Sequence, residues 1–488
     1  MGAGTQENAA AEGSCRRLRA PFWGVGCAWA AFLCAVRFTD LGGVALPVAL
    51  LSDVTAMALG AAVAAAAMVA GAVRGRIGAG FAMPSRGLLV GSGGAAAVGS
   101  IGLFGWYDGF AAVPASAALA LCVLFGAALM LVAIGWGSLY AHLEPEQLLP
   151  NGAVALVIAS LCHAAHEAAG FGTAAWLIVV VLIVASTGCA LAAQKRVSPI
   201  VPVDNEVTRD GGRTVLRALR VLWMPLAGAC LSCFIFGLTW DPIVSSEQDM
   251  RVAHQVWGAM VAGPLIMGLA VAAVSARSRG TSPLRLFDQT VYPVAVMLLL
   301  VIPVINQAFP DLRFAGNILS SGSFAVVALC MWSNMAAAVR TVPIAPRLVF
   351  SAAFVLFALC FVAGLQSIAV VGTDGRTLCL VMFAVYLGLM AVSFALDNRE
   401  EKASLVPERA ADDTRSYIHR RCDEIAQSGG LSPREIDVLY YLARGYNHAY
   451  IAKKLYISEN TVRTHVRHIY GKLNLSSRED LIDLVDGA

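Results

Sequence analysis

The sequence predicts an all-α protein with two unlike parts, a bundle of twelve membrane-spanning helices and a small four-helix domain at the C-terminus. Of its 488 residues, 58% are hydrophobic and 14% are charged, whereas soluble chains average about 45–50% apolar and about 25% charged residues. Apolar runs fill 22–396, charge becomes dense from Asp397, and the last 58 residues show capped helical periodicity. The composition excludes an ordinary soluble enzyme, a disordered chain and a disulfide-stabilised secreted fold.

Twelve apolar runs are long enough to cross a bilayer, which takes about 20 residues per helix. The weakest run is 152–170, because it contains two histidines and a glutamate. The longest connection, 194–222, divides the bundle into six plus six helices, and we expect its polar part 202–213 to be flexible. The expected spans are 22–38, 53–73, 87–107, 115–139, 152–170, 174–193, 223–240, 253–275, 287–308, 317–338, 348–371 and 376–396.

The distribution of Lys and Arg predicts the orientation of this bundle. An even number of spans places both termini on one side of the membrane. If that side is the cytoplasm, the inner loops carry fourteen Lys and Arg residues and the outer loops carry three, as the positive-inside rule requires. We therefore expect a multi-pass protein of the cell (inner) membrane, in contact with membrane lipid, with cytoplasmic N- and C-termini.

The same features predict four segments. Residues 1–21 form a cytoplasmic N-terminal segment, and residues 22–396 form the polytopic membrane domain. Residues 397–430 form a charged linker, within which 414–427 has apolar residues at helical spacing. This stretch is either a short helix that packs on the next domain or a solvated linker helix. Residues 431–488 form the C-terminal domain.

Capping signals place the helices of the C-terminal domain. Ser432-Pro433-Arg434-Glu435 is a capping box with proline at the first helical position, and Gly445 is expected to end that helix. Asn447 and Ser458 are expected to cap a second and a third helix, the third covering 459–472. A fourth helix follows near the end of the chain.

The second and third helices, joined by a tight turn, have the form of a helix-turn-helix. Residues 453–472 carry five Lys and Arg residues against one acid, Glu459. Such an excess of positive charge favours contact with DNA phosphates. The alternative is a solvated basic face on a four-helix interaction domain.

The last 58 residues resemble the LuxR/FixJ/NarL-type DNA-binding domain. The segments LSPRE, IAKKL and ISENTVRTHVRHIYGKL, with the glycine after the first helix, match its signature. The resemblance implies that the third helix enters the major groove of double-stranded DNA. It implies base-edge contacts for Arg463, Thr464 and Arg467. It implies positions near phosphates for Lys454, Asn460, Thr461, His468 and Lys472.

The fourth helix, which Ser477 is expected to begin, is usually a dimer surface in that family. The resemblance therefore implies a homodimer on DNA. Leu481, Leu484 and Val485 either pair two domains in this way or complete the core of their own domain.

The six-plus-six layout resembles the major facilitator superfamily. The loop residues Gly71–Arg76 keep that superfamily's glycine and basic residues but lack its Asp. We therefore expect a membrane-anchored, one-component transcriptional regulator whose bundle senses an unknown small-molecule ligand. The alternative is a major-facilitator-like transporter with a regulatory DNA-binding tail.

Polar groups within the spans are the candidate signal-sensing residues, since such groups are costly in lipid and usually face the interior. His163, His166 and Glu167 share one helix face, and Asp288 and Asn334 lie in later spans. Structural bonding between helices, or a place in an interface loop, is the alternative for the histidines. No P-loop, nucleophile elbow or zincin motif occurs in the sequence, so we expect no enzyme activity, catalytic residue, metal site or cofactor.

Overall fold

The computed structural model consists of two compact units, which divide between Met390 and Ala391. Every regular element that it describes is a helix, so the predicted all-α class is confirmed. The described residues are 18–35, 53–74, 84–107, 114–170, 173–197, 211–245, 250–277, 284, 287–341, 344–371, 377–395, 421–426, 428–443, 446–455, 457–475, 477, 480–481 and 484–485.

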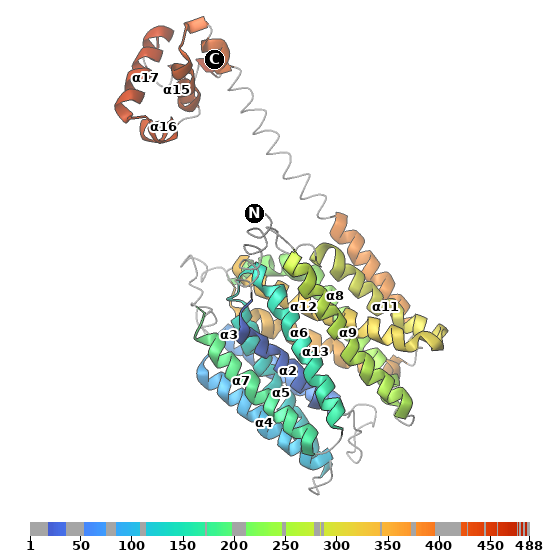
Figure 1. The fold of residues 1–488 in the computed structure, drawn as a ribbon. Helices are drawn as coiled ribbons and strands as arrows, with labels where there is room; N and C mark the ends of the chain where they lie inside the picture. The colour runs from blue at the N-terminus through green and yellow to red at the C-terminus, as the bar shows by residue number, and fades with distance from the viewer. Residues whose placement is uncertain are drawn as a thin grey trace, which may run out of the picture. The chain divides into compact units, whose positions relative to one another are not determined.

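The first unit is a bundle of long apolar helices that run alongside one another (Figure 1). Among the described residues, eleven helices are long and apolar enough to cross a membrane, and a shorter apolar stretch, Ala20–Ala35, precedes them. The predicted bundle of about twelve helices is therefore confirmed. Its elements are η1 (Ala20–Gly24), α2 (Val25–Ala35), α3 (Asp53–Arg74), α4 (Arg86–Tyr107), α5 (Ala115–Tyr140), α6 (Pro145–Ala169), α7 (Thr173–Gln194), α8 (Gly211–Ser245), α9 (Met250–Arg277), η6 (Phe287–Val291), α11 (Tyr292–Ala308), η7 (Pro310–Leu312), α12 (Arg313–Thr341), α13 (Pro346–Val371) and an unlabelled helix at Thr377–Ala395.

Of the helices that begin before the predicted apolar runs, α6 and α8 begin furthest ahead of them. α6 begins at Pro145, where Glu144 and Gln147 form a capping box. α8 begins at Gly211, so the expectation that the central connection extends to 222 is wrong. An apolar run marks only the part of a helix that is immersed in lipid, and good helix formers such as Arg, Leu and Ala carry the helix on into water.

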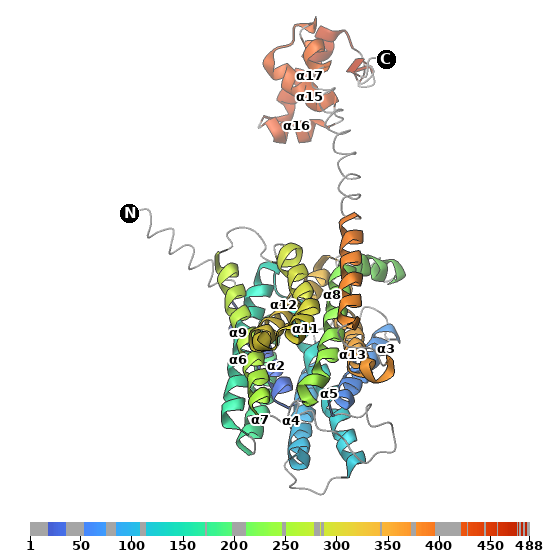
Figure 2. The same ribbon diagram turned by 90° about the vertical axis from the view of Figure 1, so that its right-hand side faces the viewer.

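The two halves of the bundle repeat one packing pattern. Figures 1 and 2 show the helices of the bundle in two views. α3 packs on α5 as α9 packs on α12, α2 packs on α6 as α8 packs on α13, and α4 packs on α5 as α11 packs on α12. Between the halves, α3 packs on α13 and α6 on α9. If each helix is replaced by its counterpart in the other half, the contact of α3 with α13 becomes the contact of α9 with α6. The bundle is therefore an internal twofold repeat.

Glycines lie at matching crossings in both halves. A Cβ on Gly126 of α5 would come within 2.0 Å of the Met57 carbonyl oxygen of α3, and one on Gly263 of α9 would come within 2.3 Å of the Ile318 carbonyl oxygen of α12. In lipid, where burial of apolar surface gives no drive for helix association, close backbone packing holds helices together. Cross-helix glycine contacts of this kind also occur at Gly26, Gly60, Gly237 and Gly364.

The second unit is a small helical domain with its own apolar core. Its labelled helices are α15 (Pro433–Ala443), α16 (His448–Leu455) and α17 (Glu459–Leu473). Residues 421–426 are also helical, and Cys422 and Ile425 are buried in the core that these helices share. The alternative in which the described part of 414–427 packs on the domain is therefore the one that the structure shows.

The end of the chain completes the same core. Leu481 is 0% exposed and Val485 is 2% exposed, and both belong to the apolar core of this domain. Arg421 joins the first helical segment of this domain to the last. Its guanidinium donates to the carbonyl oxygen of Leu484, at 3.2 Å, and to that of Val485. Leu481 and Val485 therefore belong to the core of their own domain, whereas Leu484 is partly buried and packs against that core.

Candidate nucleic-acid interface

The first helix of the C-terminal domain begins at the predicted capping box. The Ser432 backbone N–H donates to Glu435 Oε2 at 2.7 Å, and the Glu435 backbone N–H donates to Ser432 Oγ at 3.4 Å. Two of the N–H groups that lack an intrahelical partner are thereby satisfied. The predicted capping box is confirmed.

The second and third helices also begin at the predicted caps. Asn447 Oδ1 accepts from the Tyr450 backbone N–H at 2.9 Å, and Ser458 Oγ accepts from the Thr461 backbone N–H at 3.2 Å. Asn474, which follows α17, has φ 52°, a left-handed conformation that Asn tolerates better than most residues. The predicted end of the first helix at Gly445 lies outside the described residues.

The third helix, α17, has one buried and one exposed face. Val462 and Ile469 are buried, whereas Arg463, Thr464 and Arg467 are exposed. The residues that the resemblance assigned to base edges therefore lie together on the solvent face of one helix. Arginine on such a face can bond guanine through two parallel hydrogen bonds.

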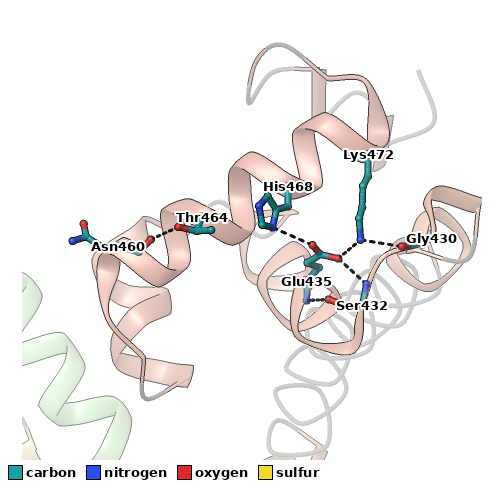
Figure 3. Close-up of polar contacts among 7 residues, drawn as sticks. All are labelled: Gly430, Ser432, Glu435, Asn460, Thr464, His468 and Lys472. Carbon is teal, nitrogen blue, oxygen red and sulfur yellow. Dashed lines mark hydrogen bonds and ion pairs between the residues drawn. The ribbon is translucent and has the colours of Figure 1, made fainter.

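Local contacts orient this exposed face without covering it. The Arg463 guanidinium lies 3.6 Å from the carboxylate of Glu459, one turn earlier. The hydroxyl of Thr464 donates to the Asn460 carbonyl oxygen at 3.0 Å (Figure 3). Exposed ion pairs of this kind are worth about 0–1 kcal/mol, so DNA can replace them at little cost.

Two residues predicted to lie near phosphates contact a carboxylate of the domain (Figure 3). Lys472 Nζ donates to Glu435 Oε2 at 2.7 Å and to the Gly430 carbonyl oxygen at 3.1 Å, and His468 Nδ1 lies 3.7 Å from Glu435 Oε1. Glu435 is 4% exposed. A phosphate contact by Lys472 would therefore have to compete with a buried partner at hydrogen-bonding distance.

The same contacts change the acidity of Glu435. The hydrogen bond from Lys472, followed by the one from the Ser432 backbone, lowers the pKa of this carboxyl from 4.5 to about 2. Both donors favour the charged form of the carboxyl. Glu435 is thus ionised at neutral pH and joins α15 to α17.

The remaining predicted phosphate contacts are exposed. Asn460 and Thr461 lie in the first turn of α17, and Lys454 lies near the end of α16. The Lys454 ammonium is 5.8 Å from the centre of the Tyr450 ring. Sequence reasoning missed Tyr450, although its spacing of four residues before Lys454 on a helix could have indicated the contact.

In the bundle, the structure brings two of the candidate signal residues together. The Asn334 side chain, from α12, donates to Asp288 Oδ1, from η6, at 2.6 Å. η6 is a single turn of π-helix, a feature that often occurs at functional sites. The sequence named these two residues separately and could not show that they meet.

The second group of candidate signal residues lies near the end of α6. His163 Nε2 and His166 Nδ1 lie 3.7 Å and 3.5 Å from Glu167 Oε1. His163 is buried, whereas Glu167 is partly exposed. Among the described residues, no three His, Cys, Asp or Glu side chains are arranged to hold a metal ion.

A contact between the halves of the bundle was not predicted. Arg340, at the end of α12, donates to Glu144 Oε2 at 2.7 Å and to the His142 carbonyl oxygen at 2.9 Å. It also donates to the Ala141 carbonyl oxygen. The charge of Arg340 was visible in the sequence, but its partners are about 200 residues away along the chain.

Comparison with known proteins identifies the C-terminal domain. Residues 430–485 match the family model described as bacterial regulatory proteins, luxR family. A putative HTH-type transcriptional regulator of Mycobacterium bovis is 46% identical over 55 residues, which are 11% of this chain and 6% of that protein. The oxygen regulatory protein NreC of Staphylococcus epidermidis is 42% identical over 65 residues, which are 12% of this chain and 30% of that protein.

These matches cover only a small part of each relative. The domain at 430–485 is a LuxR-type helix-turn-helix of the kind found in DNA-binding transcriptional regulators, as predicted. Over 77% of this chain and 89% of the other, the structure aligns with the human organic anion transporter MFSD10 at a TM-score of 0.45 and 16% identity. The eleven long apolar helices make the first unit a multi-pass membrane domain.

Proposed function

We propose that this protein is a membrane-anchored transcriptional regulator. Its C-terminal domain binds double-stranded DNA as a homodimer, and its bundle senses a small molecule and controls that binding. The observation that carries the DNA-binding part is the exposed face of α17, on which Arg463, Thr464 and Arg467 lie together within a LuxR-type domain. Phosphate contacts by Lys454, Asn460 and Thr461 would orient this helix in the major groove.

Arg467 provides the test of base recognition. Genomic fragments that the full-length protein retains in detergent micelles supply the operator, and gel shift then measures affinity for that operator and for unrelated duplex. We expect Arg467→Ala to lose operator selectivity, because one good bidentate pair is worth about 1–3 kcal/mol. Arg467→Lys keeps the charge but not the planar fork, so it should keep affinity for unrelated DNA and lose selectivity. Wild-type selectivity in both variants would refute the assignment.

The bundle is the proposed source of the input signal. The half-buried pair of Asp288 and Asn334, and the cluster of His163, His166 and Glu167, are polar groups inside spans that are largely apolar. A ligand that binds one arrangement of the bundle better would shift the equilibrium between arrangements. Both termini lie in the cytoplasm in this proposal, because the positive charges of the loops are concentrated on that side.

A reporter assay tests the sensing role. Cells carry the operator in front of a reporter gene and express either the full chain or a chain that lacks residues 1–396. We expect the response to the signal to disappear with the bundle. A response that survives the deletion would contradict the sensing role and leave DNA binding untouched.

Transport is the second candidate function, and the twofold repeat of the bundle favours it, since many transporters consist of such repeats. Proteoliposomes that contain the full chain would separate the two candidates. Uptake of the signal molecule against a control without protein would support transport with a regulatory tail. Binding without uptake would support a dedicated sensor.

A further inference from the structure

Tyr450 and Lys454 form an exposed aromatic–cation pair on α16. The ammonium lies 5.8 Å from the centre of the ring, within the distance at which a cation is attracted to an aromatic face. Tyr450 is 37% exposed, and Lys454 is exposed. The pair therefore faces the solvent and leaves the ammonium accessible to an anion.

Further tyrosines fix the position of the Tyr450 ring. It stacks on Tyr446 with the ring centres 4.3 Å apart and an angle of 11° between the planes. Tyr446 in turn meets the edge of Tyr441 at 6.0 Å, and both of these residues pack against the apolar core of the domain. Tyr450 is thus the most exposed of three tyrosines in contact, the inner two of which pack on the core. Lys454 lies against the Tyr450 ring.

The place of Lys454 in the helix-turn-helix determines what it can meet. In this motif the first helix crosses the DNA backbone, and the N-terminal residues of the second contact base edges. Lys454 is the second-last residue of α16 (His448–Leu455), and α17 begins four residues after the end of α16, at Glu459. The ammonium is therefore close in sequence to the end of α17 that approaches the bases.

The contrast with Lys472 supports this role. Lys472 is held by the buried carboxylate of Glu435, whereas Lys454 is held by a neutral ring. A ring restricts the side chain but does not neutralise its charge, so Lys454 keeps its full attraction for phosphate. In Lys472 the positive charge is already paired with a carboxylate, whereas in Lys454 it lies against a ring that carries no negative charge.

We propose that Tyr450 is a positioning residue, which holds the Lys454 ammonium ready for a DNA phosphate next to the bases that α17 reads. The proposal rests on the proposed DNA-binding function. It assigns the phosphate contact on this side of the domain to the Tyr450–Lys454 pair and gives Lys472 a structural role.

Salt-dependent binding to DNA without an operator tests the pair. The full chain in detergent micelles is titrated onto a fluorescein-labelled duplex of about 30 base pairs of mixed sequence, at about 50 to 200 mM KCl, because non-specific affinity comes from phosphate contacts. We expect Lys454→Ala to lower the slope of log affinity against log salt by about 0.9 for each domain bound. We expect Tyr450→Ala to weaken binding about two- to fivefold.

Three further variants distinguish positioning from a general structural effect. Tyr450→Phe keeps the ring and should restore wild-type affinity, and Lys454→Arg keeps the charge and should keep the slope. In the Lys454→Ala background, Tyr450→Ala should cause no further loss. An undiminished Tyr450 effect in that background, or an unchanged slope in Lys454→Ala, would overturn the proposal.

Failure of the proposed DNA-binding function would give a different set of results from failure of the Tyr450 proposal. If the wild-type chain bound neither this duplex nor selected genomic fragments, DNA binding itself would be refuted, together with the role of Tyr450. If the wild type bound and Arg467→Ala lost selectivity while Lys454→Ala changed nothing, only the role of the pair would be refuted.

Discussion

Both units of this protein bury apolar side chains, but the bundle also exposes many large ones. In the C-terminal domain, large apolar side chains such as Leu439 are buried, and charged ones such as Arg434 and Arg467 are exposed. In the bundle, Leu124 is 65% exposed, and glycines such as Gly126 lie where helices cross. Both units are all-helical, so the difference reflects the solvent: water drives the burial of apolar side chains, whereas lipid leaves close packing to hold helices together.

The two units also differ in how much their polar side chains indicate about function. Polar side chains of the third helix of the C-terminal domain, such as Arg463 and Arg467, face solvent, where DNA can reach them. Many hydroxyls of the bundle bond to their own helix, as Ser138 does to the Ile134 carbonyl oxygen and Ser232 to that of Gly228. The hydrogen bond between Asp288 and Asn334 differs, because it joins two separate elements. Such pairs are the best targets for sensing experiments.

The largest loss of stability is expected where a buried apolar side chain in the core of the C-terminal domain is truncated. Leu439→Ala should destabilise the C-terminal domain by about 2–5 kcal/mol, because it leaves a cavity at a residue that is 0% exposed. Pulse proteolysis of the full chain in a series of urea concentrations, which cleaves the C-terminal domain only where it is unfolded, measures this loss of stability. The variant Leu124→Ala, in the bundle, should change stability little, since this side chain is 65% exposed. Equal losses in both variants would show that the two units are held together in the same way.

The next effect is expected where the bundle has no room for a side chain. Gly126→Ala should destabilise the bundle by about 3 kcal/mol, because its Cβ would lie 2.0 Å from the Met57 carbonyl oxygen. All nine tryptophans lie before residue 390, so their fluorescence during heating in micelles follows the bundle. Gly188→Ala is the control, because nothing lies within 4 Å of a Cβ there. Equal melting temperatures for the two variants would contradict the close-packing account.

A smaller effect, which depends on pH, is expected at Glu435. Glu435→Gln should cost about 2 kcal/mol at neutral pH, because a charged hydrogen bond to Lys472 is lost. The carboxyl has a lowered pKa of about 2 in the folded state against 4.5 otherwise. Its contribution is therefore fully present above about pH 4.5 and disappears as the pH falls toward about 2.

Thermal unfolding of the C-terminal domain at a series of pH values, monitored by pulse proteolysis, checks this prediction. The wild type should lose stability between about pH 4.5 and about pH 2, and Glu435→Gln should lose less over the same range. Parallel curves for the two proteins would show that Glu435 is not the group responsible.

The smallest effect is expected at the N-cap of α17. Ser458→Ala should cost about 1 kcal/mol, because the Thr461 backbone N–H loses its acceptor. Ser458→Asp keeps an acceptor at this position and should keep the stability of wild type. The same proteolysis assay measures both variants, and a loss in Ser458→Asp as large as that in Ser458→Ala would argue against the cap.

The starts of the first three helices of the C-terminal domain were predictable to the residue. Its caps at Ser432, Asn447 and Ser458 are local, because each side chain bonds a backbone group three residues away. The exposed face of α17 follows from helical periodicity in the same way. The role of Leu481 was not predictable, because an apolar side chain at the end of a chain suits a dimer surface and a core equally well.

For the bundle, the sequence was sufficient for the class of fold and the approximate positions of the spans, since a helix that crosses lipid must be long and apolar. Packing alone decided which helices meet, that Asp288 meets Asn334, and that Lys472 bonds Glu435 while Lys454 rests on Tyr450. The physical reason is distance along the chain. Composition, caps and helix periodicity act over a few residues, whereas a contact between elements depends on the mutual fit of whole helices.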